Sequence, residues 1–415
     1  GPDRLFPAET ISNPLLGGNV TITVESAYAA AWGRFFESRT AATVTHVSET
    51  EVRVALRTQT VHPTVSASAS AVGTSRLELG GVQTLYADSY DSADGPYPGR
   101  AGASSDAVIQ TADELHLTAS GGENTESIQI RGDLVAESYK IPGGQADKLT
   151  VTGQRRVGGG PADAIPVSGA MRARTTAVRD AAGPDESGFE LDDGSTRTID
   201  ADITFTGDVA VADGSTLQIA NGAAVRVRGG LDVSETGRVV LDGSNGDVRL
   251  LVEDDLSLQG AGAIRSAGGS HNGLYVDGET DTQGASSITT AADTRLDLLT
   301  TGAVAIEDQV RITADDDIAR NLWLYSSGAA IDIEGDAGDG VGFIGVVYAP
   351  ESGVTLGDRL TLTGSVTANR FAFDDADLAI HYDESLRNRR PFGGESAPVM
   401  SHLHVSSHRV TIDDG

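Results

Sequence analysis

Short pairs of apolar residues recur along most of this 415-residue sequence, and turns rich in Gly, Asp, Asn and Ser separate them. The two residues of a pair lie two positions apart, which is the period of a half-buried β-strand. The pairs are Leu77/Leu79, Leu115/Leu117, Ile128/Ile130, Leu149/Val151, Ile203/Phe205, Val209/Val211, Leu217/Ile219, Val225/Val227, Leu231/Val233, Val239/Leu241, Leu250/Val252, Leu256/Leu258, Leu296/Leu298, Val304/Ile306, Ile331/Ile333, Val346/Tyr348, Val354/Leu356, Leu360/Leu362 and Phe371/Phe373. Most pairs follow one another after six to ten residues, so each strand has room for only two inward side chains.

These runs are too short for the strands of a typical β-sandwich, but they fit the short sides of a β-solenoid. In that fold each coil stacks on its neighbour, and the inward residues form ladders. The 51 glycines suit the corners, and an aromatic content of 5% suits a narrow interior filled by Val, Ile, Leu and Ala. We therefore predict a mainly β protein whose main part is a right-handed parallel β-helix. A large β-sandwich is the competing architecture.

A small N-terminal unit over residues 19–60 has a different pattern. The aromatic residues between 28 and 36 have helical spacing, and Ser26 is a candidate N-cap for this helix. Alternating apolar residues predict strands at 20–24, 44–47 and 52–56. The unit is therefore predicted to have the order β-α-β-β.

The remaining segment boundaries follow from changes in the spacing of apolar residues along the chain. A helix over 168–182, with Met171 and Val178 facing inward, interrupts the series of strands and ends at a Gly-Pro stop signal. We expect the interruption to be an excursion from one solenoid. The predicted segments are a leader or tag-removal scar over 1–18, first coils over 61–153, the helical excursion over 154–195, the main β-helix over 196–386, and a linker with a final strand over 387–415.

The charge of the chain limits its partners. It carries 60 Asp and Glu against 30 Lys and Arg, a formal charge of −30. Nucleic acid and anionic membrane surfaces both require a cationic protein surface, so neither is an expected partner. Only Lys140 and Lys148 are lysines. Such an acidic, lysine-poor chain suits concentrated salt, where screening weakens the repulsion between like charges, and we expect a halophilic source.

Two sets of residues are candidate metal ligands. His402, His404 and His408 are evenly spaced, which would place them on one face of an extended strand, and imidazole is a common metal ligand. Asp242 and Asp247 bound an acidic turn that could supply oxygen ligands to calcium. Asp and Asn also favour turns for conformational reasons, and no turn follows a known calcium-binding repeat. Calcium is therefore a candidate ion and no other cofactor is expected.

Catalytic signals are absent from the sequence. There is no cysteine, which excludes disulfides, thiolate metal sites and a cysteine nucleophile. The sequence contains no nucleophile-elbow, zinc-protease, phosphate-loop or dinucleotide-binding motif. Because acidic residues are everywhere, paired carboxylates say little, and we predict no catalytic or cofactor-binding residue. Asn19 starts the sequon Asn-Val-Thr and is a candidate for glycosylation if the chain is exported.

Two segments resemble a known family. The first, over 19–40, contains Val-Thr-Ile-Thr-Val-Glu-Ser followed by Ala-Trp-Gly-Arg-Phe-Phe-Glu. The second, over 342–386, contains a G-x-x-Y-A-P run, then Gly-Ser-Val, and closes with Ile-His-Tyr-Asp-Glu-Ser-Leu. In content and order these segments resemble haloarchaeal type IV pilin-like surface proteins. That resemblance implies a pilin-type signal and a hydrophobic N-terminal helix, followed by a β-helical domain outside the cell.

The hydrophobic helix of that family is missing here, since no apolar run approaches the roughly 18 residues that a membrane helix needs. The resemblance implies a non-enzymatic extracellular protein, pilin-like or adhesin-like, that acts in surface attachment or assembly. Its expected partners are other surface or pilus subunits, or surface glycans, and it would meet the membrane only through the missing anchor. The alternative function is a carbohydrate-active β-helix enzyme, either a polysaccharide lyase or a hydrolase.

Overall fold

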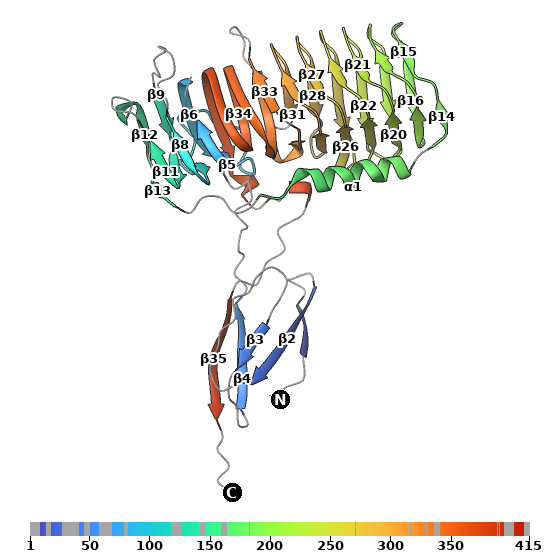
Figure 1. Cartoon of the computed structure of the whole chain (residues 1–415). Coiled ribbons are helices and arrows are strands. Elements are labelled where there is room, and N and C mark those ends of the chain that lie inside the picture. Colours follow the sequence, from blue (N-terminus) through green and yellow to red (C-terminus); the bar gives the residue numbers. More distant parts are fainter. Residues whose placement is uncertain are drawn as a thin grey trace. The chain divides into compact units, whose positions relative to one another are not determined.

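The protein divides into two compact units in a computed structural model (Figure 1). One unit comprises residues 64–393, and the other comprises 1–63 together with 394–415. The structure describes the strands 9–13, 18–26, 41–44, 50–57 and 402–410, and residues 69–393 except 79–81, 118–126, 142–145, 159–163, 182, 270, 316, 329, 336–340, 388 and 390. In this described part, no helix is both long and apolar enough to cross a membrane.

The terminal unit joins the two ends of the chain. Its strands are β1 (Glu9–Asn13), β2 (Gly18–Ser26), β3 (Ala41–Val44), β4 (Thr50–Arg57) and β35 (His402–Val410). β2 pairs with β1 antiparallel and with β3 parallel, while β4 pairs antiparallel with β35. β1 lies within the stretch that we assigned to a leader, and its backbone pairing with β2 makes it part of the unit. The predicted helix around residues 28–36 lies outside the described residues.

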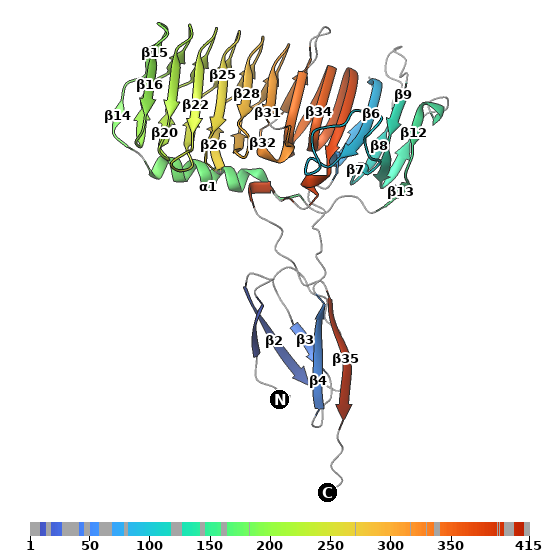
Figure 2. The ribbon, with the colours of Figure 1, turned by 180° about the vertical axis from the view of Figure 1, so that it is seen from behind.

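The larger unit is a β-solenoid of short parallel strands, which confirms the predicted fold class and excludes the sandwich (Figures 1 and 2). One turn of the chain takes 24 residues in its middle part, where Val248 N donates to Asn272 Oδ1. The first strands along the chain are β5 (Ala71–Glu78), β6 (Val82–Tyr90), β7 (Ala107–Thr111), β8 (Glu114–His116), β9 (Ser127–Ile130), β10 (Gly132–Ala136), β11 (Ser138–Lys140), β12 (Leu149–Val151) and β13 (Arg155–Val157).

After the helix α1 (Val167–Asp180), a second and longer series of coils begins. Its strands are β14 (Asp185–Glu186), β15 (Phe189–Leu191), β16 (Thr196–Ile199), β17 (Ile203–Phe205), β18 (Val209–Val211), β19 (Thr216–Ile219), β20 (Ala224–Val227), β21 (Leu231–Val233), β22 (Arg238–Asp242), β23 (Arg249–Val252), β24 (Leu256–Leu258), β25 (Ala263–Ala267), β26 (His271–Val276), β27 (Thr280–Thr282), β28 (Ser287–Thr290), β29 (Arg295–Thr300), β30 (Val304–Ile306), β31 (Arg311–Ala314), β32 (Leu322–Ser326), β33 (Ala330–Glu334) and β34 (Val341–Asp383). Strands β14 and β15 lie within the predicted excursion, so the coils resume earlier than we expected.

The predicted inward pairs form the core of the solenoid. Val209, Leu231 and Leu256 align in successive coils, and all three are buried. The exception is Val346/Tyr348, because Val347 and the alanine after Tyr348 face the interior at that strand. Val346 and Tyr348 point to the other face, where they are buried in a second cluster with α1. Of the other predicted residues, Leu79 lies outside the described part.

Acidic corners add a second set of bonds between coils. The Asp208 carboxylate accepts a hydrogen bond at 2.9 Å from the backbone N–H of Gly230, which lies 22 residues further on. Asp255 accepts in the same way from Glu279 N at 2.8 Å, across 24 residues. At other corners Asp213 has a φ of 47°, a left-handed conformation that Asp and Asn adopt more readily than most side chains. Acidic residues at the turns therefore serve two purposes: some adopt the backbone conformation that the turn requires, and others accept hydrogen bonds from the adjacent coil.

The order of the coils in space differs from their order along the chain. Strand β5 pairs with residues 366–371 of β34, and β6 pairs with residues 376–383 of the same strand. The first coils therefore stack on the last coil of the second series and continue outward through β13 (Figure 1). We expected one sequential solenoid. Local periodicity could not reveal this order, because it does not specify which strands pair.

Helix α1 is the crossover that makes this order feasible. Its 14 residues span about 21 Å at 1.5 Å per residue, the reach of four or five coils spaced about 4.8 Å apart. It packs along strands β20, β23, β26, β32 and β34 (Figure 2). Met171 and Val178 are buried as predicted, against Leu251, Leu299 and Trp323 on the outer face of the coils. These central strands are consequently buried on both faces.

The N-terminus of α1 is held by residues of the G-x-x-Y-A-P segment and the residue after it. The Tyr348 hydroxyl donates to the carbonyl of Ile165 and accepts from its N–H, both at 2.8 Å. The Glu351 carboxylate accepts from the N–H groups of Val167 and Ser168 at 2.7 and 3.0 Å. A carboxylate at this end satisfies free N–H groups and favours the helix dipole.

Replacing Glu351 with Ala should loosen the first turn of α1 without disturbing the coils. We expect the opening free energy of this turn to fall by about 1 kcal/mol, as for other lost helix caps. Hydrogen–deuterium exchange of peptides covering 164–181 measures this change. Glu190→Ala is the matched control, because Glu190 is exposed on β15. Equal exchange in both variants would contradict the capping role.

Candidate functional site

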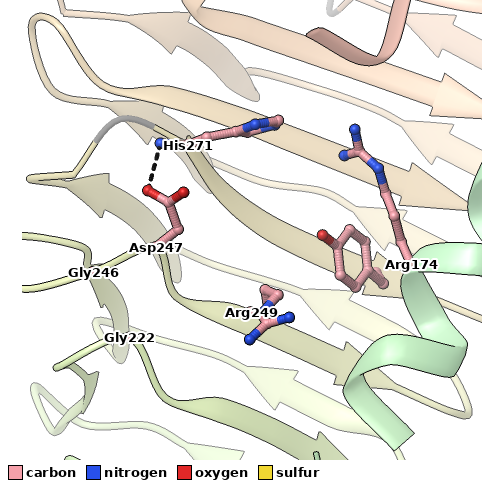
Figure 3. A pocket seen from close by; sticks show the side chains of 7 residues that line it. Arg174, Gly222, Gly246, Asp247, Arg249 and His271 are labelled. Carbon is pink, nitrogen blue, oxygen red and sulfur yellow. Dashed lines mark hydrogen bonds between the residues drawn. The ribbon is translucent and has the colours of Figure 1, made fainter. Parts of the chain in front are cut away.

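A pocket of about 520 Å³ lies on the side of the solenoid, beside α1 (Figure 3). Arg174 reaches it from the helix, while Arg249 and His271 belong to strands β23 and β26. Asp247 lies in the turn before β23, and its carboxylate accepts a hydrogen bond from His271 N at 3.0 Å. Gly222, Gly246 and Tyr275 complete the lining.

A fully buried carboxylate, Asp297, holds two sides of this pocket together. Its Oδ2 lies 2.5 Å from an Arg174 guanidinium nitrogen and 2.7 Å from His271 Nε2. Its Oδ1 lies 2.8 Å from Arg295 Nε. Asp297 thus links the crossover helix to strands β26 and β29. The His271 contact is electrostatic, since Nε2 has no aligned hydrogen-bond acceptor.

The ionised form of Asp297 depends on these cations. Burial alone would raise the pKa of this carboxyl group, because charge is unfavourable in a low-dielectric interior. The charges of Arg295 and Arg174, together with the contact from His271, outweigh burial and hold the pKa of Asp297 well below its usual range. Asp297 therefore stays ionised and cannot supply a proton near neutral pH.

The local sequence explains why Asp297 lies under the helix. In β29 its neighbours Leu296 and Leu298 face the interior of the solenoid, so Asp297 faces outward, where α1 covers it. In the preceding coil Gly273 aligns with Asp297. A Cβ at Gly273 would overlap the Tyr275 hydroxyl, so the close packing of Tyr275 requires glycine there.

Aromatic residues pack beside these ion pairs. Tyr325 stacks on Trp323 and Phe392, with ring centroids 5.5 and 4.6 Å apart. The Tyr325 hydroxyl accepts a hydrogen bond from Phe392 N at 2.8 Å, and Arg295 lies over the Trp323 ring. Phe392 belongs to the segment that we predicted as a linker, and here it anchors the end of the solenoid chain.

Of the predicted metal candidates, only Asp247 belongs to this pocket. Asp242 instead stabilises its own turn, because its Oδ1 accepts hydrogen bonds from the N–H and hydroxyl of Ser244. Its Oδ2 accepts from Gln218. Within the described residues, no three His, Asp or Glu side chains gather as a metal site would require. Calcium binding by Asp242 and Asp247 stays a prediction.

The other two predictions concern the terminal unit. His402, His404 and His408 lie in β35, whose pairing with β4 shifts register between Val405 and Ser407. Asn19 lies in β2 and pairs with Ser12 of β1. Metal binding by the histidines and glycosylation of Asn19 stay predictions.

Sequence reasoning missed Arg174, Arg249, His271 and Asp297. They come from α1 and from successive coils, and no local spacing connects them. One signal was present, since Asp297 interrupts the apolar run Leu-Asp-Leu-Leu of β29. A charge in a strand buried on both faces must be paired.

A second polar cluster lies at the Ile-His-Tyr-Asp-Glu-Ser-Leu segment. His381 Nδ1 lies 2.7 Å from Asp88 Oδ1, and the Tyr97 hydroxyl donates to Asp88 Oδ2 at 2.7 Å. Burial and this hydrogen bond raise the pKa of Tyr97 well above its usual value. Asp383 accepts from the N–H of Ser92 at 3.1 Å. These contacts fasten the loop over 91–106 to the last coil, which is a structural role.

Comparison with protein families gives a match over part of the solenoid. The profile of a domain of unknown function, DUF7305, matches residues 273–389. The matched stretch runs from β26 to the end of the solenoid chain and includes Asp297. Comparisons with curated proteins and with solved structures give no match.

Replacing Asp297 with Asn should strongly destabilise the solenoid. The change leaves Arg174 and Arg295 without their buried counter-charge, and breaking a buried ion pair costs about 3 to 5 kcal/mol. Chemical denaturation followed by circular dichroism measures the free energy of unfolding. Asp232→Asn is the control, because Asp232 is exposed on β21, and it should change stability by less than about 0.5 kcal/mol.

The stabilisation by Asp297 should also depend on pH. Because its pKa is lowered in the folded protein, the stabilisation is fully present above the unfolded-state pKa, about 3.9. It is lost progressively as pH falls below that value toward the lower pKa of the folded state. The stability difference between wild type and Asp297→Asn should therefore be about 1 kcal/mol smaller at pH 3 than at pH 6. A constant difference would contradict the ion-pair assignment.

Proposed function

We propose that this chain is a non-enzymatic, pilin-like or adhesin-like surface protein of a halophilic archaeon that acts in attachment or assembly. One observation carries the proposal. The solenoid is inserted in the chain between β4 and β35, and these two strands pair with each other in the terminal unit. Both ends of the solenoid chain are thus tied to one small sheet, which suits the display of a rigid domain.

The internal construction of the solenoid supports a binding or assembly role. Its coils are joined by backbone pairing, by a continuous apolar interior and by Asp carboxylates at the corners. The family-like segments hold α1 and the loop over 91–106 through Tyr348 and His381. These contacts fix the helix and the loop against the coils, which supports a role as a stable scaffold.

The chemistry of the pocket favours binding over glycan hydrolysis. Glycosidases use two carboxyl groups, one of which must be protonated to act as an acid. Asp297 is held ionised by Arg295, His271 and Arg174, and it is saturated by these contacts. The pocket lining contains one carboxylate, that of Asp247.

The proposed location is the cell surface, with anchoring by a hydrophobic N-terminal helix of the pilin type. The charge of −30 and the two lysines support a protein that works in concentrated salt. Partners in this proposal are neighbouring surface subunits or surface glycans.

The test is made in the source organism with a C-terminal epitope tag. Protease added to intact cells should remove the tagged protein while leaving a cytosolic marker uncut. Deleting the gene should reduce attachment of cells to a surface or to one another, and the wild-type gene should restore it. Protection of the protein until cells are lysed would overturn the proposed location. Shortening of a polysaccharide by the purified chain would overturn the non-enzymatic role.

A further inference from the structure

The pocket beside α1 carries positive charge in a strongly acidic protein. Arg174, Arg249 and Arg295 contribute three positive charges in the lining and the contacts directly behind it. Asp247 and Asp297 contribute two negative charges. With histidine taken as neutral, one positive charge is left over, whereas the whole chain has a charge of −30.

Arg249 is the source of this excess. Arg174 and Arg295 are both committed to Asp297. The Arg249 guanidinium makes no ion pair with any residue in the described part of the chain, and it lines the pocket half-buried (Figure 3). A guanidinium presents its N–H groups in a planar fork that matches a carboxylate. Arg249 is therefore available to a ligand.

The rest of the lining suits a hydroxylated ligand of modest size. The pocket volume of about 520 Å³ lies within the range of small-molecule sites. The exposed Asp247 carboxylate can accept hydrogen bonds from hydroxyl groups, and Tyr275 offers an aromatic surface with a polar end. Gly222 and Gly246 leave that side without side chains.

We propose that this pocket binds a uronate, a sugar residue that carries a single carboxylate. The carboxylate pairs with Arg249 and approaches Arg174, while the sugar hydroxyls face Asp247. One excess positive charge matches one carboxylate. A polyphosphate would bring at least two negative charges next to Asp247, and like charges at this distance repel. The inference deepens the proposed function, in which surface glycans are a partner.

Titration calorimetry of the full chain with sodium glucuronate tests the proposal at fixed pH and ionic strength. Glucose, acetate and inorganic phosphate are titrated in parallel. Glucuronate should bind saturably and at least tenfold more tightly than each of the others. Glucose lacks the carboxylate that pairs with Arg249, and acetate and phosphate lack the sugar hydroxyls that donate to Asp247. Each of these charge-assisted hydrogen bonds contributes about a factor of ten or more in affinity. Arg249→Gln should weaken glucuronate binding at least tenfold. Arg238→Gln is the matched control, because Arg238 is exposed on β22 and makes no ion pair in the described part, and it should bind as wild type does.

Four results would overturn the inference. These are no saturable binding of glucuronate, equal binding of glucose, equal binding of phosphate or acetate, and an unchanged affinity in Arg249→Gln with its circular dichroism preserved. Failure here is distinct from failure of the proposed function. If the protein binds uronate but is confined to the cell interior, only the proposed function fails. If it lies on the cell surface but does not bind uronate, only the uronate inference fails.

Discussion

Stacking of each coil on its neighbour is the constraint on which the rest of this structure depends. Every short strand satisfies its N–H and C=O groups only through parallel strands in adjacent coils, because a strand of three or four residues cannot be stable alone. The ladder through Val209, Leu231 and Leu256 fills the interior that this stacking creates. The Asp208 and Asp255 carboxylates extend the same principle to the corners, where they bond to backbone N–H groups one coil away.

The acidity of the chain therefore has two physical roles. Exposed carboxylates suit solvation in concentrated salt, which is the role that composition indicates. Corner carboxylates such as Asp208 and Asp247 instead accept hydrogen bonds between coils. Asp297 has a third environment, fully buried and neutralised by cations. Counting acidic residues cannot separate these roles, because Asp208 and Asp247 bond to residues 22 and 24 positions away and one partner of Asp297 lies on α1.

The pocket is a consequence of the crossover. Because the chain enters the solenoid in the middle and must return from one end, α1 runs along the outer face of the central coils. It covers strands that would otherwise face solvent, and it brings Arg174 to Asp297 and His271. Without α1, the ion pair between Asp297 and Arg295 on that outer face would be exposed to water. An exposed ion pair contributes little to stability.

The sequence by itself determined the short strands, nearly all the inward residues and the helix with Met171 and Val178 buried. These features depend on neighbours two to four positions apart, so the local period of apolar residues specifies them. The tertiary structure decided the order of the coils, the outward burial of Val346 and Tyr348, and the gathering of Arg249, His271 and Asp297 beside α1. The physical reason is that pairing between parallel strands is non-local. Backbone hydrogen bonds are the same for any strand partner, and only packing of whole coils selects one.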